Sequence, residues 1–130
     1  LVTHDMIENV LADAKRCRAA TAAHHVTDTV KYANMRGYIE RTIDRDYVWC
    51  VSTPQIFLTN LYRAAAYTAK KDGFAGTDDC SLAERLGFEV KLTEVGGDNI
   101  KITYSEDISR AEEILHRRKS EDSKGKDGSS

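Results

Sequence analysis

The chain has 130 residues, of which 41% are hydrophobic and 31% are charged, and its formal net charge at pH 7 is −2. This length and composition predict one domain, or part of a larger one, with enough apolar residues to bury a core. The small net charge gives no sign of a nucleic-acid or membrane surface, and no apolar run is long enough to span a bilayer.

The three cysteines, Cys17, Cys50 and Cys80, form no C-x-x-C pair, and their number is odd. Small buried thiols in a reduced, cytosolic protein are the simplest interpretation. The chain begins with Leu1 and its first methionine is Met6. We therefore expect the sequence to be truncated or processed.

The first half of the chain predicts a helix, a strand and a hairpin. Thr3 is a suitable N-cap, and apolar residues recur at helical spacing from there to about Arg18. Residues 19–26 are short and apolar, as in a strand. Two β-prone stretches within 29–43 flank turn residues at 34–37, which indicates a hairpin. Its faces are so polar that we expect it to lie on something else, and a partner subunit is the natural candidate.

A buried strand and two helices are predicted next. The nearly continuous apolar run at 47–51 is typical of a buried strand in a parallel or mixed sheet, and Pro54 should end it. A helix at about 60–71 follows, with Thr59 as its N-cap. Residues 77–86 should form a short helix closed by a glycine.

The C-terminal part alternates again between strand and helix patterns. The predicted elements are a half-buried strand at 88–92, a turn at Gly96-Gly97, a strand at 100–103, a helix from the cap Ser105 to about Lys119, and a disordered tail at 120–130. Strands alternating with helices predict an α/β sandwich with a mostly parallel sheet.

Two clusters of potential ligands have simple structural interpretations. Asp78 and Asp79 could form a carboxylate pair for acid–base or metal chemistry, but at a predicted helix start capping is the better account. The dipeptide His24-His25 suggests a metal site. Adjacent strand residues point to opposite faces, however, so these two cannot chelate one ion. No metal site is predicted in this chain.

Four short segments, in this order, resemble one enzyme family. They are Val26-Thr27-Asp28-Thr29-Val30-Lys31, Ile43-Asp44-Arg45, Thr53-Pro54-Gln55 and Asp98-Asn99-Ile100-Lys101-Ile102-Thr103. Residues 1–119 thereby resemble the C-terminal part of the 2-C-methyl-D-erythritol 4-phosphate cytidylyltransferases of non-mevalonate isoprenoid biosynthesis. The resemblance implies part of a Rossmann-like nucleotidyltransferase fold, an α/β three-layer sandwich, with a protruding β-hairpin arm at about 29–46.

The resemblance also implies roles for four residues. By itself, Arg45 could be a solvated turn residue in a local ion pair; the family resemblance implies that its guanidinium grips the substrate phosphate in the other subunit's active site. Lys101 alternates with apolar neighbours in a predicted strand and would hold the same phosphate. Thr29 would donate a hydrogen bond to it from the neighbouring subunit, and Thr53 would line the pocket.

The implied reaction joins CTP and methylerythritol phosphate into the CDP-alcohol with release of pyrophosphate, in a homodimeric, Mg²⁺-dependent enzyme of the bacterial cytoplasm or plastid stroma. The family's glycine-rich loop and His-Asp-Ala-Ala-Arg-Pro segment, which hold the CTP and help bind the metal, are absent from this sequence. We therefore expect the 130-residue chain alone to be inactive. Two alternatives stay open, a ribitol 5-phosphate cytidylyltransferase and a non-catalytic dimerisation or interaction module.

Overall fold

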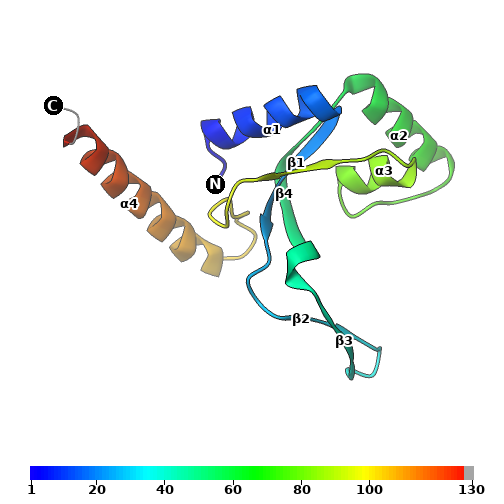
Figure 1. Cartoon of the computed structure of the whole chain (residues 1–130), viewed down its shortest axis with the longest axis horizontal. Helices are drawn as coiled ribbons and strands as arrows, with labels where there is room; N and C mark the ends of the chain where they lie inside the picture. The colour runs from blue at the N-terminus through cyan, green and yellow to red at the C-terminus, as the bar shows by residue number, and fades with distance from the viewer. Residues whose placement is uncertain (128–130) are drawn as a thin grey trace.

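A computed structural model gives the fold, and it describes residues 1–127 (Figure 1). The elements in chain order are α1 (His4–Cys17), β1 (Ala19–His25), β2 (Val30–Ala33), β3 (Ile39–Ile43), the short 3-10 helix η1 (Arg45–Tyr47), β4 (Trp49–Phe57), α2 (Thr59–Lys71), α3 (Asp79–Arg85), β5 (Lys91–Glu94) and α4 (Glu106–Asp127). Between residues 1 and 127, no helix is both long and apolar enough to cross a membrane.

Three strands form the central sheet, in the order β4-β1-β5. Strand β1 runs antiparallel to β4 and parallel to β5. The sheet is therefore mixed, which corrects the prediction that it is mostly parallel. The chain leaves β1, forms the β2-β3 hairpin as a separate two-stranded sheet, and returns along β4, so the antiparallel pair follows directly from the hairpin.

Helices pack on both faces of β1. On one face, Val10 and Ala14 of α1 pack against Ala20 and Ala22, which point the same way because they are two positions apart in the strand. On the other face, Gln55 of β4, which is paired with Thr21, makes hydrogen bonds to Asp78 and Cys80 at the start of α3. The sheet therefore lies between two helical layers, as the predicted three-layer α/β sandwich requires.

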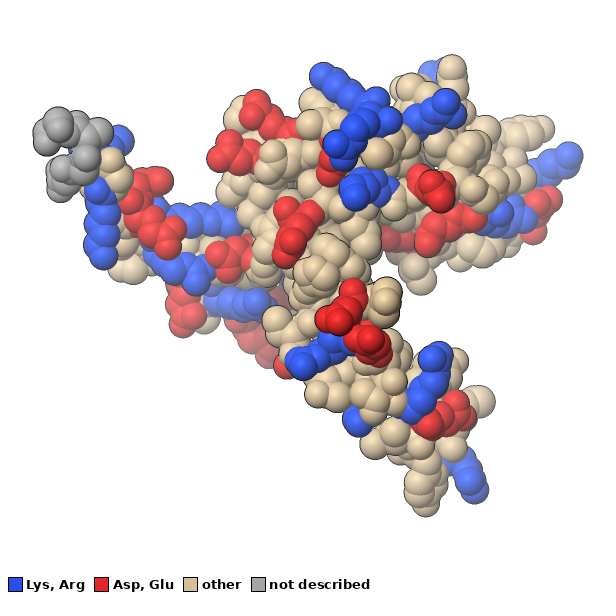
Figure 2. All heavy atoms as spheres, viewed as in Figure 1, with Lys and Arg blue, Asp and Glu red and all other residues tan. Residues whose placement is uncertain are grey.

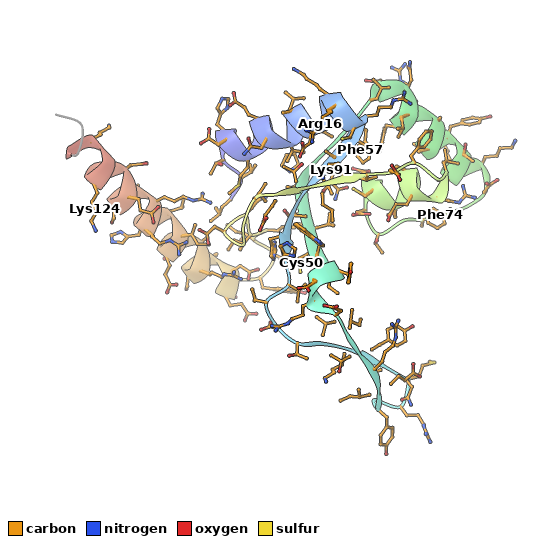
Figure 3. The ribbon with its side chains drawn as sticks, in the orientation of Figure 1. Arg16, Cys50, Phe57, Phe74, Lys91 and Lys124 are labelled. Carbon is orange, nitrogen blue, oxygen red and sulfur yellow. The ribbon has the colours of Figure 1, made fainter. Side chains whose placement is uncertain are left out.

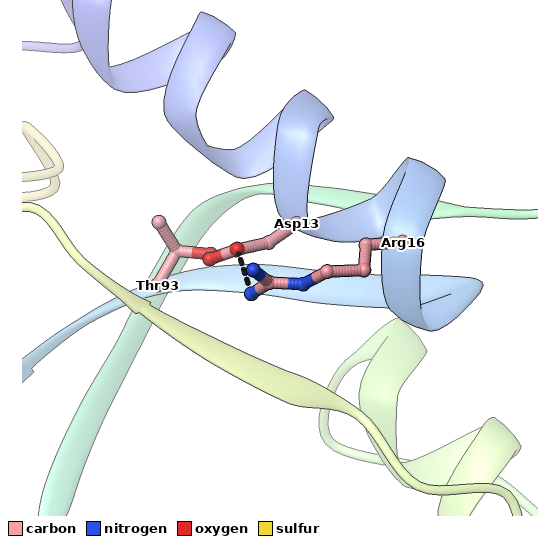
Figure 4. A network of polar contacts seen from close by, with 3 residues as sticks. All are labelled: Asp13, Arg16 and Thr93. Carbon is pink, nitrogen blue, oxygen red and sulfur yellow. Dashed lines mark hydrogen bonds and ion pairs between the residues drawn. The ribbon is translucent and has the colours of Figure 1, made fainter.

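Helix α1 begins and is held as its sequence predicts. The Thr3 hydroxyl accepts a hydrogen bond from the N–H of Met6, which confirms Thr3 as the N-cap. Further along, the Asp13 carboxylate accepts from the hydroxyl of buried Thr93 in β5 at 2.7 Å and pairs with Arg16 at 2.8 Å (Figure 4). This network joins the polar side of α1 to the far strand of the sheet.

The β2-β3 hairpin projects from the body as an arm (Figure 1). Its turn is closed by Asn34, whose side-chain oxygen accepts from the N–H groups of Arg36 and Tyr38. Arg41 stacks over the ring of Tyr32 at 5.1 Å, and Met35 at the tip is fully exposed. In the view of Figure 2 the arm carries both positive and negative side chains. The predicted hairpin is thus confirmed, with its apolar side chains largely in solvent.

Strand β4 differs from its prediction in length and burial. It continues through Pro54 to Phe57, because the pairing with β1 is irregular between Thr21 and Ala23 and the proline lies in the opposing bulged stretch. Cys50 is exposed, so the expectation that all three thiols are buried was wrong (Figure 3).

Helix α2 also starts differently from the prediction. Its N-cap is Leu58, not Thr59, because the backbone of Leu58 is anchored by donating to Arg18 and accepting from Tyr62. No side-chain hydrogen bond caps this end. Leu61, Ala65 and Ala69 form the buried face of α2, whereas Tyr62, which has the same apolar spacing in the sequence, is exposed.

Three further corrections concern the C-terminal part. The strand predicted at 88–92 is β5 at 91–94, because residues 87 and 88 still donate to carbonyls of α3 as the chain leaves that helix. Residues 100–103 are not a strand, since no strand within residues 1–127 pairs with them. Helix α4 continues past the predicted end near Lys119 to Asp127, through residues expected to be disordered; residues 128–130 lie outside the described part.

Candidate active site

An open pocket of about 730 Å³ lies beside β4. Strand β4 lines one side of it with residues 51–53 and Gln55, and the irregular segment 99–102 lines another. Two of the four residues predicted from the family resemblance, Thr53 and Lys101, lie in this one pocket although they are far apart in the sequence. Both side chains are exposed and thus accessible to a ligand.

Asn99 joins the two sides of this pocket. Its side-chain amide donates to the backbone carbonyl of Thr53 at 2.6 Å and to the hydroxyl of Ser52 at 3.3 Å. On the outer side of the same segment, Asp98 pairs with Arg117 of α4 at 2.6 Å. No role was predicted for Asn99 from the sequence, although it lies in the quoted segment that contains Lys101.

Gln55 organises the pocket floor between β4 and α3. Its amide nitrogen donates to the Asp78 carboxylate at 3.2 Å, and its amide oxygen accepts from the N–H of Cys80 at the same distance. Asp78 also accepts from the N–H of Ser81 and so caps α3, which confirms the capping interpretation. Gly76 precedes this turn, and a Cβ there would clash with the Ser81 hydroxyl. No contact was predicted for Gln55 from the sequence.

Arg45 and Thr29 lie elsewhere, where the arm joins the body. Arg45 is in η1, is exposed, and donates through its guanidinium to the backbone carbonyl of Thr27. Arg45 does not form the alternative local ion pair with Asp44. The Asp44 carboxylate instead accepts a hydrogen bond from the N–H of Asp46. Thr29 is exposed just before β2. Neither Arg45 nor Thr29 lines the pocket that contains Thr53 and Lys101.

The pocket contains charges of both signs. Lys101 and Arg110 supply positive charge, and Asp78 and Asp107 supply negative charge. The N–H groups of Tyr104 and Thr103 donate to Asp107 and, together with the Arg110 charge, lower the pKa of that carboxyl. The Asp107 charge is therefore compensated at the start of α4.

The two histidines have different surroundings. His24 lines the pocket, whereas the His25 ring lies against the ring of Trp49, with 3.7 Å between the centroids. Within residues 1–127, no three His, Cys, Asp or Glu side chains gather closely enough to hold a metal ion.

Comparison with known proteins shows the family. The model of the 2-C-methyl-D-erythritol 4-phosphate cytidylyltransferases matches residues 1–117. The chain belongs to this family. It is 42% identical over 118 residues to the cytidylyltransferase of Desulforamulus reducens, with 91% of this chain and 50% of that one covered. It is 48% identical over 103 residues to that of Geobacillus kaustophilus, which covers 79% of this chain and 45% of the relative.

Solved structures of the family have the same fold. The cytidylyltransferase of Thermus thermophilus superposes with a TM-score of 0.78 at 33% identity, covering 89% of this chain and 57% of that one. The 4-diphosphocytidyl-2C-methyl-D-erythritol synthase of Anaerococcus prevotii superposes with a TM-score of 0.82 at 30% identity, covering 89% and 54%. The chain therefore spans about half the length of the relatives it matches, and the predicted Rossmann-like nucleotidyltransferase class is confirmed.

Proposed function

We propose that this chain forms the alcohol-phosphate side of a cytidylyltransferase active site. In the whole protein, a phosphate oxygen of methylerythritol phosphate attacks the α-phosphorus of CTP. A new P–O bond forms, the bond between the α-phosphorus and its bridging oxygen breaks, and pyrophosphate leaves with that electron pair. The products are the CDP-alcohol and pyrophosphate. Such a reaction depends on positioning and on neutralising phosphate charge, which are tasks for exposed cations in a pocket.

The observation that supports this function best is the separation of the proposed phosphate contacts into two pairs. Thr53 and Lys101 lie in the pocket beside β4, while Thr29 and Arg45 lie at the base of the projecting arm. Within one chain, the two pairs do not line a common pocket. We therefore propose a homodimer in which the arm of one subunit carries Thr29 and Arg45 to the pocket of the other.

The four side chains suit a phosphate ligand. The planar guanidinium of Arg45 can make two parallel charge-assisted hydrogen bonds to phosphate oxygens, and the Lys101 ammonium adds a mobile positive charge. The hydroxyls of Thr29 and Thr53 can each donate one hydrogen bond. Arg45 already donates to the carbonyl of Thr27, so its side chain is oriented toward the loop between β1 and β2 that carries Thr29.

The other substrate and the metal belong to a different part of the whole protein in this proposal. The described residues hold no cluster of metal ligands, so we propose that CTP and Mg²⁺ are bound mainly by the half of the family fold that this chain does not span. The bound ion would supply positive charge to the triphosphate. We propose a cytoplasmic location, which agrees with three free cysteines and with bacterial relatives.

A chimaera tests this function. Residues 1–117 replace the matching part of the Geobacillus kaustophilus relative, and pyrophosphate release is measured with CTP and either methylerythritol phosphate or ribitol 5-phosphate. We expect turnover with methylerythritol phosphate only. A folded chimaera that binds CTP but turns over neither alcohol phosphate would refute an enzymatic role and favour the interaction-module alternative. Turnover with ribitol 5-phosphate alone would refute the proposed substrate.

A further inference from the structure

The segment that carries Lys101 is irregular, and its ends are held by Asp98, which pairs with Arg117, and by the N–H of Thr103, which donates to Asp107. Residues 99–103 belong to no helix or strand, and Lys101, Ile102 and Thr103 are exposed. Asn99 is its one buried side chain, with 9% of its surface exposed. A buried amide needs hydrogen-bond partners, because leaving one unpaired costs about 1–3 kcal/mol. The contacts of Asn99 are therefore the ones that tie this segment to β4.

Both hydrogen bonds of the Asn99 amide nitrogen end on β4. The short one, at 2.6 Å, goes to the carbonyl of Thr53, and the longer one, at 3.3 Å, goes to the Ser52 hydroxyl. The Thr53 carbonyl belongs to the residue whose side chain lines the pocket, and Lys101 follows Asn99 by only two residues. One side-chain amide thus joins the backbones on which both pocket residues are carried.

The bulge in β4 makes these acceptors available. The pairing between β1 and β4 is interrupted opposite residues 52–54, so this stretch is not fully engaged in the sheet. The Ser52 carbonyl accepts from Thr21 and Gln55 on one side, while the Ser52 hydroxyl and the Thr53 carbonyl face Asn99 on the other.

We propose that Asn99 is a positioning residue that sets the place of Lys101 relative to Thr53. It acts through the backbone, because its amide nitrogen is engaged with β4. This inference rests on the proposed function of the pocket. Only an uncharged donor fits here, because a carboxylate at Asn99 would face the carbonyl and hydroxyl oxygens of β4 without a proton to donate. An apolar residue would leave the Thr53 carbonyl without this partner.

The test uses the chimaeric enzyme with Asn99→Ala and Asn99→Asp. Both are expected to lower kcat/KM for methylerythritol phosphate by about tenfold or more, since a small displacement of a positioning group has effects of that size. KM for CTP should stay within about twofold of wild type. Thr93→Val is the matched control. It removes another buried side-chain hydrogen bond, on the α1 side of the sheet, and should leave both kinetic constants near wild type.

A second readout needs no activity. Amide hydrogen exchange followed by mass spectrometry should show faster exchange in peptides covering 98–103 in both Asn99 variants, and unchanged exchange there in Thr93→Val. If the Asn99 variants keep wild-type kcat/KM for the alcohol phosphate, or exchange at 98–103 is unchanged, the positioning role is refuted. A wild-type chimaera without turnover would refute the proposed function, and the exchange data would still decide whether Asn99 holds the segment.

Discussion

Two variants that each impair the site should combine into a more active mixed dimer if the arm of one subunit completes the pocket of the other. The perturbation is a pair of chimaeric enzymes, one with Arg45→Ala and one with Lys101→Ala. Each removes a charge-assisted hydrogen bond to phosphate, of about 1.5–3 kcal/mol. Each homodimer should therefore lose roughly 10- to 100-fold in kcat/KM for methylerythritol phosphate. CTP binding should change little, because neither residue is assigned to the nucleotide.

The geometry sets the size of the recovery. In a mixed dimer, the pocket on the Arg45→Ala subunit keeps its own Lys101 and receives an intact Arg45 from the other subunit. The second pocket lacks both groups. Random mixing in equal amounts gives about half heterodimers, each with one complete site, so about one quarter of wild-type activity should return. If all four contacts came from one chain, every site would carry one defect and no recovery would occur.

The assay is pyrophosphate release at limiting methylerythritol phosphate, after the two variants are unfolded together and refolded, or co-expressed with different tags and purified as heterodimers. Arg41→Ala is the control, because Arg41 is another exposed arginine of the same arm that stacks on Tyr32. It should keep near-wild-type turnover. Purified heterodimers with no more activity than the homodimers would refute the cross-subunit site.

Three further predictions concern stability. Thr93→Val should lower the free energy of unfolding by about 1 kcal/mol in urea titrations, because the Asp13 carboxylate loses the hydrogen bond from Thr93. Gly76→Ala should lower Tm, because the added Cβ meets the Ser81 hydroxyl. Burial, followed by the neighbouring Asp78 charge, raises the pKa of the Cys80 thiol from 9.0 to about 11. The thiol therefore ionises more readily in the unfolded chain, and the free energy of unfolding should fall as the pH rises from 9 to 11.

Each of these predictions has its own control. Asp13→Asn combined with Thr93→Val should cost less than the sum of the two single changes, since both remove the same contact. Adding Ser81→Ala should rescue Gly76→Ala if the clash is the cause. Cys80→Ala should weaken the loss of stability between pH 9 and 11 relative to wild type. Fully additive effects would contradict the Asp13–Thr93 hydrogen bond, and a Gly76→Ala variant that Ser81→Ala does not rescue would contradict the clash. A Cys80→Ala variant with the pH dependence of wild type would contradict the role of the Cys80 thiol.

Local signals predicted the helices better than the strands. Thr3 and Asp78 act as caps where the sequence places them, because capping depends on residues three positions apart. Pro54 was expected to end a strand, and only the interrupted pairing with β1 lets β4 continue past it. Residues 100–103 have strand-like alternation but no neighbouring strand in the described structure, and a strand requires a partner.

The sequence alone determined the family, because four short motifs in a fixed order identify it, and it named Arg45, Lys101, Thr29 and Thr53 as candidates. The resemblance also implied that Arg45 and Thr29 reach the pocket from a neighbouring subunit, but it gave no geometry within this chain. Only the tertiary structure placed Thr53 and Lys101 in one pocket and the other two at the base of the arm. The reason is physical: the pocket arises where a bulged strand meets an irregular segment, and that meeting depends on a long-range hydrogen bond from Asn99 that no local pattern encodes.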